Sequence, residues 1–334
     1  MKVQDAPAPS PATILGVGGY LPERVVPNTE LCDRIGVSDD WIVQRSGIRQ
    51  RRFAAPDENI AVMGHAAATK ALASAGIDPV DVDCVIAATM THLRQAPAVA
   101  AEIADLLGTG ANVAAAFDLS AGCAGFCYAV NVAKDMIASG SAKHVLVVGT
   151  ERMSDIIDPE DRGSAFLFGD GAGAVVIGPG TDRGIGPVVW GSDSARSSVI
   201  SQPRDWTELK DEPGGPFPYL QLAGPTVFRW AVTEMGQVAQ RALDAAGVGT
   251  DELSAMIPHQ ANLRITDALA EKLDLPDSVV VSRDIADIGN TSAASIPLAM
   301  ERLLARDGGL SGGNALLIGF GAGLLYAAQV VKLP

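Results

Sequence analysis

The chain has 334 residues, 48% of them hydrophobic, which is enough for two cores or for one duplicated unit. Its formal net charge of −14 argues against nucleic acid or an anionic membrane as the main partner. No apolar run reaches the roughly 18 residues of a membrane span.

The ends of the chain and its cysteines indicate where the protein works. Residues 1–11 lack the apolar segment of a secretory signal and are expected to be a short disordered lead. The four cysteines (Cys32, Cys84, Cys123 and Cys127) fit reduced thiols better than a disulfide framework. We therefore expect a cytoplasmic location.

Strands and helices alternate along the first half of the chain. Strands are expected at residues 12–22, 84–90, 145–149 and 172–177, and a strand followed by a helix within 117–135. Helices are expected at residues 28–35, from Ser38 through Trp41 and Arg45, at 57–75 and at 97–107. This alternation indicates a layered α/β fold with a mostly parallel sheet.

A segment rich in Gly and Pro at residues 178–187 predicts a boundary, so we divide the chain into 12–182 and 183–334. Strands are expected at residues 186–190, 255–259, 279–282, 315–320 and 325–332, and helices at 225–246, 261–273 and 291–305. Residues 196–218 are polar and rich in Pro and Gly, which favours a surface loop beside a site. The two halves have similar numbers of elements, which suggests a duplicated architecture.

Cys123 lies in a run of small residues, Ser-Ala-Gly-Cys-Ala-Gly, at the expected change from strand to helix. Small residues permit a sharp turn there. A cysteine at a helix N-terminus can be a nucleophile, because the N–H groups and the helix dipole favour thiolate. Free cysteines are also often buried packing residues, so this segment alone leaves both interpretations open.

Among the four histidines, His259 is the strongest candidate partner for a thiol. It ends an expected strand and precedes a polar cluster, where α/β sheets usually place their ligands. His65 and His144 lie at element edges, where solvated or capping roles are common, and His92 is a weaker candidate at a strand end.

Two further segments could hold a carbonyl oxygen. Asn290 opens an expected helix and is either a helix cap or a neutral hydrogen-bond donor. The Gly-Phe-Gly-Ala-Gly segment at 319–323 is too near the C-terminus for a dinucleotide-binding βαβ unit. It is better suited to present backbone N–H groups to an oxyanion.

Taken together, the motifs resemble β-ketoacyl-acyl-carrier-protein synthase III, of the thiolase superfamily. The matching segments are Ser-Ala-Gly-Cys-Ala-Gly-Phe at 120–126, Phe-Gly-Asp-Gly-Ala-Gly-Ala at 168–174, Pro-His-Gln-Ala-Asn-Leu-Arg at 258–264, Gly-Asn-Thr-Ser-Ala-Ala-Ser at 289–295, and also 39–48 and 158–163. The ending at 318–328 is similar to the actinobacterial branch. The resemblance covers residues 12–334 and implies a homodimer with a five-layered α/β/α/β/α fold built from two pseudo-symmetric halves.

The resemblance implies a catalytic triad of Cys123, His259 and Asn290, with an oxyanion hole formed by the backbone N–H groups of Cys123 and Ala322. The implied reaction is a decarboxylating condensation of an acyl-CoA with malonyl-acyl carrier protein through an acyl-Cys123 intermediate, which initiates fatty-acid synthesis. It needs no metal and no redox cofactor. Thiolases need a late second cysteine and elongating ketosynthases a second late histidine, and the chain has neither.

The resemblance also implies binding residues, listed here by role. CoA contacts fall to Trp41, Arg45, Arg162 and Asn262, and docking of the acidic carrier protein to Arg229, Arg264 and Lys272. Glu271 stands where the best-known bacterial members have a lysine. Ala96 occupies the position before Pro97 where a bulky aromatic residue restricts other members to acetyl, so we expect branched or longer acyl starters.

Two other functions are consistent with a reactive thiol. A related acyltransferase, or a starter-unit ketosynthase of polyketide or specialised metabolism, would use the same thiolate. Acyltransferases of this kind often lose the triad asparagine, so Asn290 favours condensation. A non-catalytic scaffold that binds carrier protein would be expected to lose the thiol or the histidine, and both are present.

Overall fold

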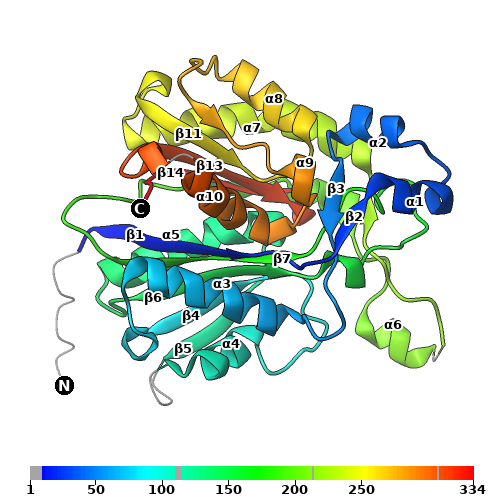
Figure 1. Cartoon of the computed structure of the whole chain (residues 1–334), viewed down its shortest axis with the longest axis horizontal. Coiled ribbons are helices and arrows are strands. Elements are labelled where there is room, and N and C mark those ends of the chain that lie inside the picture. The colour runs from blue at the N-terminus through cyan, green and yellow to red at the C-terminus, as the bar shows by residue number, and fades with distance from the viewer. Residues whose placement is uncertain (1–9, 110–113, 213, 307) are drawn as a thin grey trace.

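The computed structural model describes residues 10–109, 114–212, 214–306 and 308–334, and most of the expected N-terminal lead lies outside these ranges. Two five-stranded sheets lie one above the other in Figure 1, with helices between them and on both outer faces. None of the helices within the described ranges is long and apolar enough to cross a bilayer.

The two sheets have the same internal order. The first holds, side by side, β1 (Ala12–Tyr20), β7 (Gly171–Pro179), β6 (Val145–Glu151), β4 (Cys84–Ala88) and β5 (Ala115–Leu119). The second holds β8 (Val189–Ser192), β14 (Leu325–Lys332), β13 (Asn314–Gly321), β11 (Leu253–Pro258) and β12 (Val280–Val281). Two short ribbons pair β2 (Val25–Pro27) with β3 (Gln50–Arg52), and β9 (Ile200–Ser201) with β10 (Gln221–Leu222).

The helices complete the layers. They are α1 (Asn28–Ile35), α2 (Asp39–Ser46), α3 (Ile60–Ala75), α4 (Val99–Leu107), α5 (Gly125–Ala138), α6 (Trp206–Asp211), α7 (Gly224–Ala246), α8 (Leu263–Lys272), α9 (Ile285–Ile288) and α10 (Ser295–Arg306). Helices α3 and α4 cover the outer face of the first sheet, and α7 and α8 that of the second. Helices α5 and α10 lie between the sheets, so the predicted five layers and two pseudo-symmetric halves are confirmed.

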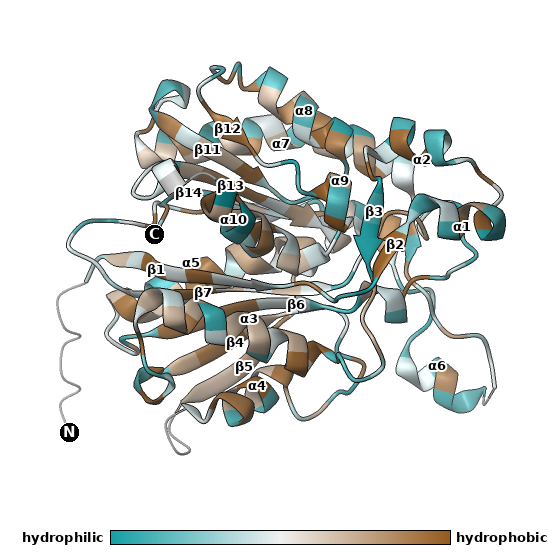
Figure 2. Ribbon diagram, in the orientation of Figure 1, coloured by the Kyte–Doolittle hydropathy of each residue, from teal (hydrophilic) through white to brown (hydrophobic). Residues whose placement is uncertain are grey.

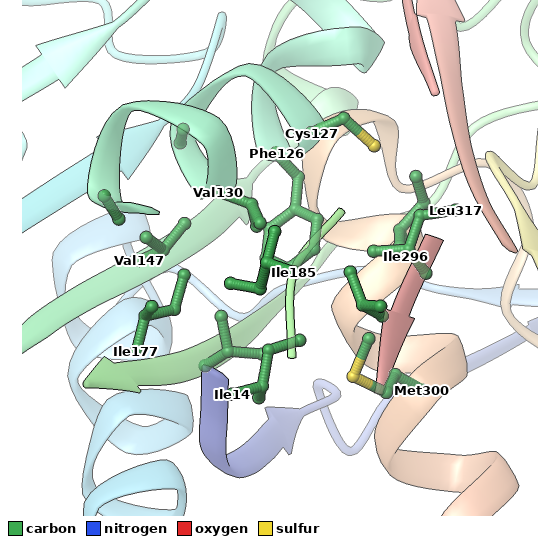
Figure 3. Packing of buried hydrophobic residues seen from close by; sticks show 14 of the residues in the cluster. Ile14, Phe126, Cys127, Val130, Val147, Ile177, Ile185, Ile296, Met300 and Leu317 are labelled. Atoms are coloured by element: carbon green, nitrogen blue, oxygen red, sulfur yellow. The ribbon is translucent and has the colours of Figure 1, made fainter. Parts of the chain in front are cut away.

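The central layer contains a large apolar core to which both halves contribute. Phe126 of α5 and Met300 of α10 pack with Ile14 and Ile177 of the first sheet and Leu317 of the second (Figure 3). Burying one such side chain contributes roughly 1.5–3 kcal/mol. This core therefore holds the two sheets at a fixed separation.

The prediction of a mostly parallel sheet is wrong, because each sheet is mixed. In the first sheet β4 pairs in parallel with β5 and β6, whereas β7 runs antiparallel to both β6 and β1. A parallel return needs a crossover that spans the sheet, usually a helix. The connection from β6 to β7, residues 152–170, contains a 3-10 turn and no α-helix, and only the turn Ala322–Leu324 separates β13 from β14.

Most predicted elements are present, with shifted ends. Helix α3 begins at Ile60 rather than near residue 57, because the Asn59 side chain accepts from the N–H groups of Ala61 and Val62 at 3.0 Å. The segment 196–218 is not a plain loop: it contains β9 and α6, and α6 projects from the body of the molecule in Figure 1. The division at residue 182 stays a prediction.

Hydrophilic residues also occur inside the structure. Figure 2 shows β3 in teal, yet its Arg51 is fully buried. The Arg51 guanidinium donates to Asn28 Oδ1 at 2.7 Å and to the carbonyl oxygens of Val26 and Phe166. Burial lowers the pKa of the Arg51 guanidinium to about 10. The hydrogen bonds to Asn28, Val26 and Phe166 offset part of the cost of removing this group from water. Arg51 thereby fixes the segment around Phe166, which forms one wall of the cavity described below.

The two halves come into close backbone contact at Gly149 on β6. A Cβ atom there would lie 2.4 Å from the Ala293 carbonyl oxygen, which is a backbone atom. We expect Gly149→Ala to destabilise the fold by more than about 3 kcal/mol, because the backbone cannot move aside as a flexible side chain can. The free energy of unfolding in urea, followed by circular dichroism, measures the change.

Gly224 at the start of α7 is the matched control, since a Cβ atom there meets nothing within 4 Å. Gly224→Ala should change the unfolding free energy by less than about 1 kcal/mol. Equal stability of the two variants would contradict the close packing at Gly149.

Candidate active site

Cys123 lies on the sharp turn between β5 and α5. The turn is the 3-10 segment Gly122–Ala124, and Gly122 has φ +51. A Cβ atom at Gly122 would lie 3.2 Å from the backbone nitrogen of Ala322, so the small residue allows the end of β13 to approach the thiol. Gly321 permits the same approach, since a Cβ atom there would lie 2.8 Å from Cys123 Cβ.

The Cys123 thiol is only 8% exposed, and its electrostatic setting differs from the expected one. Burial raises its pKa to about 12, although the nearby Ser292 hydroxyl and the N–H groups of Cys123 and Ala322 lower it. The expectation that the helix N-terminus favours thiolate is therefore overridden by desolvation. The backbone donors of Cys123 and Ala322 that were predicted to form an oxyanion hole converge on the sulfur.

His259 follows β11 directly and lies inside the structure, 2% exposed. Its Nδ1 is 2.7 Å from Ser295 Oγ, and its ring meets Phe320 edge to face, with ring centroids 5.4 Å apart. Burial lowers the His259 pKa to about 3, so the imidazole is neutral at physiological pH. If the Ser295 hydroxyl donates to Nδ1, Nε2 carries the proton and is the group free to donate to a substrate.

Asn290 lies before the 3-10 turn Ser292–Ala294 that opens α10, and the N-cap position of that turn is Thr291. Its backbone is fixed on both sides, because its N–H donates to the Leu167 carbonyl at 2.8 Å and its own carbonyl accepts from Gly169 at 3.0 Å. Its side-chain Oδ1 accepts from the Ser292 N–H at 2.8 Å. This contact directs the amide so that Nδ2 is the atom left for a ligand.

Cys123, His259 and Asn290 line one cavity of about 720 Å³. Its wall is largely apolar, and β9, β10 and the start of α7 contribute to it. The apolar lining residues are Met90, Met153, Phe166, Leu167, Phe168, Ile200, Leu220, Leu222, Val227, Phe228, Ile265 and Phe320. Such a wall suits an acyl chain, and the segment expected beside a site does contribute Ile200 to it.

Three arginines, Arg45, Arg229 and Arg264, also line the cavity. The Arg264 guanidinium lies over the Phe228 ring, 4.9 Å from its centroid. Arginines can bind the phosphates of a nucleotide or of a phosphopantetheine arm by bidentate hydrogen bonds. The cavity is thus apolar around the triad and has cationic groups for a charged ligand.

Trp41 is flanked by two guanidinium groups. Arg45 lies 4.3 Å and Arg162 5.2 Å from the centroid of its ring, and Phe166 contacts it edge to face at 5.4 Å. The predicted pair Trp41 and Arg162 is therefore together. An adenine that stacks between them has to displace the Arg162 guanidinium from the ring.

Three predicted binding residues have other contacts or positions. Asn262 caps α8 by accepting from the Arg264 N–H, and it donates to the Arg45 carbonyl, so it ties α8 to α2. Lys272 donates to the Thr233 carbonyl at 2.6 Å and does not line the cavity. Ala96 is exposed and also does not line it.

Sequence reasoning missed two groups near the triad. Ser295, which contacts His259, lies in the motif 289–295 and could have been noticed there. Glu151, a fully buried carboxylate at the end of β6, gave no signal, because its burial depends on packing between the halves. The described part of the chain contains no cluster of three or more His, Cys, Asp or Glu side chains placed to hold a metal ion.

Comparison with known proteins relates this site to one family. Family models described as 3-oxoacyl-[acyl-carrier-protein] synthase III, and as its C-terminal part, match residues 117–194 and 243–333. The chain is 56% identical to "Beta-ketoacyl-[acyl-carrier-protein] synthase III" of Streptomyces glaucescens, over 100% of this chain and 99% of the relative. It is 51% identical to the mycobacterial synthase III of Mycobacterium avium, with the same coverage.

Solved structures give the same relationship and confirm the thiolase-like fold. The priming β-ketosynthase of the R1128 polyketide biosynthetic pathway superposes with a TM-score of 0.97 at 48% identity, over 100% of this chain and 99% of that one. The synthase III of Aquifex aeolicus superposes with a TM-score of 0.87 at 38% identity, over 96% and 99% of the two chains.

Because His259 is neutral in the folded protein, the free energy of unfolding should depend on pH. The His259 pKa is about 3 in the folded protein and 6.5 in the unfolded chain. Below pH 6.5 the unfolded chain therefore binds a proton that the folded chain does not. Stability from this group is complete above pH 6.5 and is lost as the pH falls towards 3. The advantage of wild type over His259→Gln in unfolding free energy should shrink by up to about 1.4 kcal/mol per unit between pH 6 and 4.

Urea unfolding of both proteins at several pH values measures this difference. The His259→Gln variant is its own control for every other titrating group, because those groups are common to both chains. A difference that does not vary with pH would show that His259 titrates normally.

Proposed function

Because the chain belongs to the β-ketoacyl-[acyl-carrier-protein] synthase III family, of actinobacterial type, we propose that it condenses an acyl-CoA with malonyl-acyl carrier protein and so starts fatty-acid synthesis. The observation that carries this function is the convergence on one apolar cavity of a thiol, a neutral histidine and a free asparagine amide. A decarboxylating acyl transfer needs a nucleophile and neutral donors for a carbonyl oxygen.

In the first half-reaction Cys123 Sγ attacks the thioester carbonyl of the acyl-CoA. The backbone N–H groups of Cys123 and Ala322, which converge on the sulfur in the free protein, hold the negative oxygen of the tetrahedral intermediate. CoA leaves, and the acyl group remains on Cys123 with its chain along the apolar wall. Trp41, Arg45 and Arg162 hold the nucleotide end of CoA, a role supported by the stacked guanidinium groups.

In the second half-reaction malonyl-carrier protein binds, and its thioester oxygen accepts from His259 Nε2 and Asn290 Nδ2. Both donors are neutral, so they stabilise the enolate that forms as carbon dioxide leaves without taking up a charge themselves. The enolate carbon attacks the acyl carbonyl and releases the Cys123 sulfur. Arg229 and Arg264, at the cavity, attract the acidic carrier protein; Lys272 contributes less, since α7 carbonyls hold it.

A second function shares this chemistry. The high structural similarity to a priming ketosynthase of a polyketide pathway favours a starter-unit role as the alternative. The two differ in the carrier protein that accepts the product. Parallel assays with the carrier protein of fatty-acid synthesis and with a polyketide carrier protein distinguish them, and a preference for the latter would support the alternative. Either role places the enzyme in the cytoplasm.

We expect a homodimer built on the free edge of the first sheet. Strand β5 is an edge strand whose Phe117 is 36% exposed, and Leu106 of the adjacent α4 is 49% exposed. An unpaired apolar edge tends to pair with a second copy. Ala96 lies outside the cavity of its own chain. It can therefore limit the length of the acyl chain only by entering the cavity of the second copy. A monomer in sedimentation velocity at micromolar concentration would contradict this assembly.

The triad roles can be separated by mutation. With acyl-CoA and malonyl-carrier protein, Cys123→Ala should abolish carbon dioxide release and product, because no acyl-enzyme forms. Asn290→Ala should still form acyl-enzyme, whereas condensation falls by on the order of 10²-fold, as for the loss of an oxyanion donor. Mass spectrometry of the acylated protein and product assays measure the two steps.

Thermal unfolding controls for the turn that Asn290 also supports through its contact with Ser292. If Asn290→Ala loses acylation and condensation to the same degree while remaining folded, the role assigned to its amide is wrong.

The small side chain at Ala96 predicts the starter. Isobutyryl- or longer acyl-CoA should be used with higher kcat/KM than acetyl-CoA, and Ala96→Phe should reverse this preference by about tenfold or more. Ala96→Ser is the matched control and should keep the wild-type preference. Equal or better activity of the wild type with acetyl-CoA would contradict the prediction.

A further inference from the structure

Glu151 is a buried carboxylate to which the mechanism above gives no role. It ends β6, is fully buried, and makes no ion pair with any described residue. Its Oε2 accepts from Thr91 Oγ1 at 2.7 Å and from Thr89 Oγ1 at 3.0 Å, and the Met90 N–H donates to the same oxygen at 3.1 Å. Burial raises the Glu151 pKa even with these donors.

This carboxylate reaches the turn that follows Asn290. Glu151 Oε1 is 3.5 Å from the Ala293 backbone nitrogen, and Gly149 lets β6 approach the same turn closely. Ser292, the residue before Ala293, has φ +49, a left-handed conformation that is rare for a residue with a side chain. Such strain persists only where the surroundings impose it.

The turn Ser292–Ala294 packs against both the Cys123 turn and strand β6, which ends in Glu151. The Ser292 hydroxyl is close enough to lower the pKa of both Cys123 and Glu151. Ser292 Oγ is nevertheless buried without a partner at ordinary hydrogen-bond geometry. A buried hydroxyl left unpaired near two groups that can ionise is well placed to donate to whichever becomes charged.

The surrounding titratable groups do not provide another proton acceptor. His259, from β11, is hard to protonate, with a pKa of about 3, and Cys127, one turn along α5, has a pKa of about 12. Arg152, next to Glu151, pairs with Asp155 at 3.2 Å. Cys123 is buried at the cavity, so a bound acyl-CoA would cover the thiol, and an internal acceptor for its proton would remain available.

We propose that Cys123, Ser292 and Glu151 form a proton-transfer line and share one negative charge near neutral pH. This inference rests on the proposed function. As Sγ bonds to the acyl carbon, the thiol proton passes to Ser292 Oγ while the Ser292 proton passes to Glu151. The bond from the acyl carbon to the CoA sulfur breaks, and CoA leaves as a thiolate that takes a proton from water. When condensation breaks the bond to Cys123, its thiolate recovers the proton from Glu151 by the same route.

The line also controls charge during the cycle. The Glu151 carboxylate raises the pKa of Cys123, because a thiolate and a carboxylate in one buried site repel each other. In the acyl-enzyme the proton resides on Glu151 and the pair is neutral. The negatively charged malonyl group then enters the cavity while the carboxyl behind Cys123 carries no charge. In this line Ser292 exchanges its proton with the reacting sulfur, whereas Glu151 is a positioning residue that acts through Ser292.

Two measurements on Glu151→Gln test the proposal, because they should change in opposite directions. Iodoacetamide is small and, unlike acyl-CoA, does not fill the cavity. Its reaction with Cys123 therefore reports only how readily the thiolate forms. Without the neighbouring charge, Glu151→Gln should be alkylated several-fold faster than wild type at pH 9. As the pH is raised towards 9, the alkylation rate of Glu151→Gln should rise about tenfold per pH unit. The wild-type alkylation rate should be independent of pH over part of the same interval.

Acylation by acyl-CoA should instead be slower. Glu151→Gln and Ser292→Ala should each acylate at pH 7 on the order of 10²-fold more slowly than wild type, as expected for the loss of a general base. The double variant should be no slower than either single variant, since both remove one line. Ser292→Ala should also be alkylated more slowly, because it loses the donor to sulfur. Peptide mass spectrometry assigns both reactions to Cys123.

Asp170→Asn is the matched control for burial of a carboxylate. Asp170 is also fully buried with a raised pKa, and it accepts from Ser154 and Ala54, away from Cys123. Asp170→Asn should leave both rates per folded enzyme within about twofold of wild type, and thermal unfolding gives the folded fraction. If Glu151→Gln does not fold, the slow alkylation and slow acylation of Ser292→Ala still test the line.

The outcomes are distinct. Parallel loss of alkylation and acylation in folded Glu151→Gln, or acylation at the wild-type rate, would overturn the proposal. If the wild type itself forms no acyl-enzyme from acyl-CoA, the proposed function fails. The alkylation profile then still decides whether Cys123 and Glu151 share a charge, because it uses no substrate.

Discussion

The site depends on how closely the backbone of one half can approach the helix start of the other half. Gly319 and Gly321 bring β13 against the turn at Cys123, and Gly149 brings β6 against the turn at Ala293. At each of these glycines a Cβ atom would lie 3.0 Å or less from a neighbouring atom. Close contact is what lets a backbone N–H from one half serve a thiol in the other. The large shared core between the sheets keeps these contacts in place.

Burial sets the chemistry of the site as strongly as the identity of its residues. The same dry environment keeps His259 neutral and raises the pKa of Cys123. A neutral histidine is what decarboxylation requires of a donor, but a high thiol pKa works against nucleophilic attack. The protein therefore needs local hydrogen-bond donors around the sulfur, and the backbone N–H groups of Cys123 and Ala322 supply them, with the Ser292 hydroxyl also lowering the thiol pKa.

Most of the architecture and the triad could be predicted from the sequence, because both follow from local patterns. Small residues around Cys123, a histidine at a strand end and an asparagine before a helix are each visible in a few consecutive letters. Strand direction was not visible in this way: whether β7 runs with or against β6 depends on what connects them in space. Glu151 and Ser295 were missed for a similar reason, since their roles come from contacts between segments 142 and 36 residues apart in sequence. The positions of Lys272 and Ala96 relative to the cavity likewise required coordinates.

The two turns with left-handed residues, at Gly122 and Ser292, occupy equivalent places in the two halves. Each opens a central helix, α5 or α10, and each is met by the end of a strand from the opposite half. The active site is thus assembled from both halves. The first half provides the nucleophile and the carboxylate, and the second half provides the backbone donor and the hydroxyl. Neither half is a working unit alone. A small sliding motion of one sheet over the other would separate both pairs at once, which couples the reactivity of the thiol to the rigidity of the whole fold.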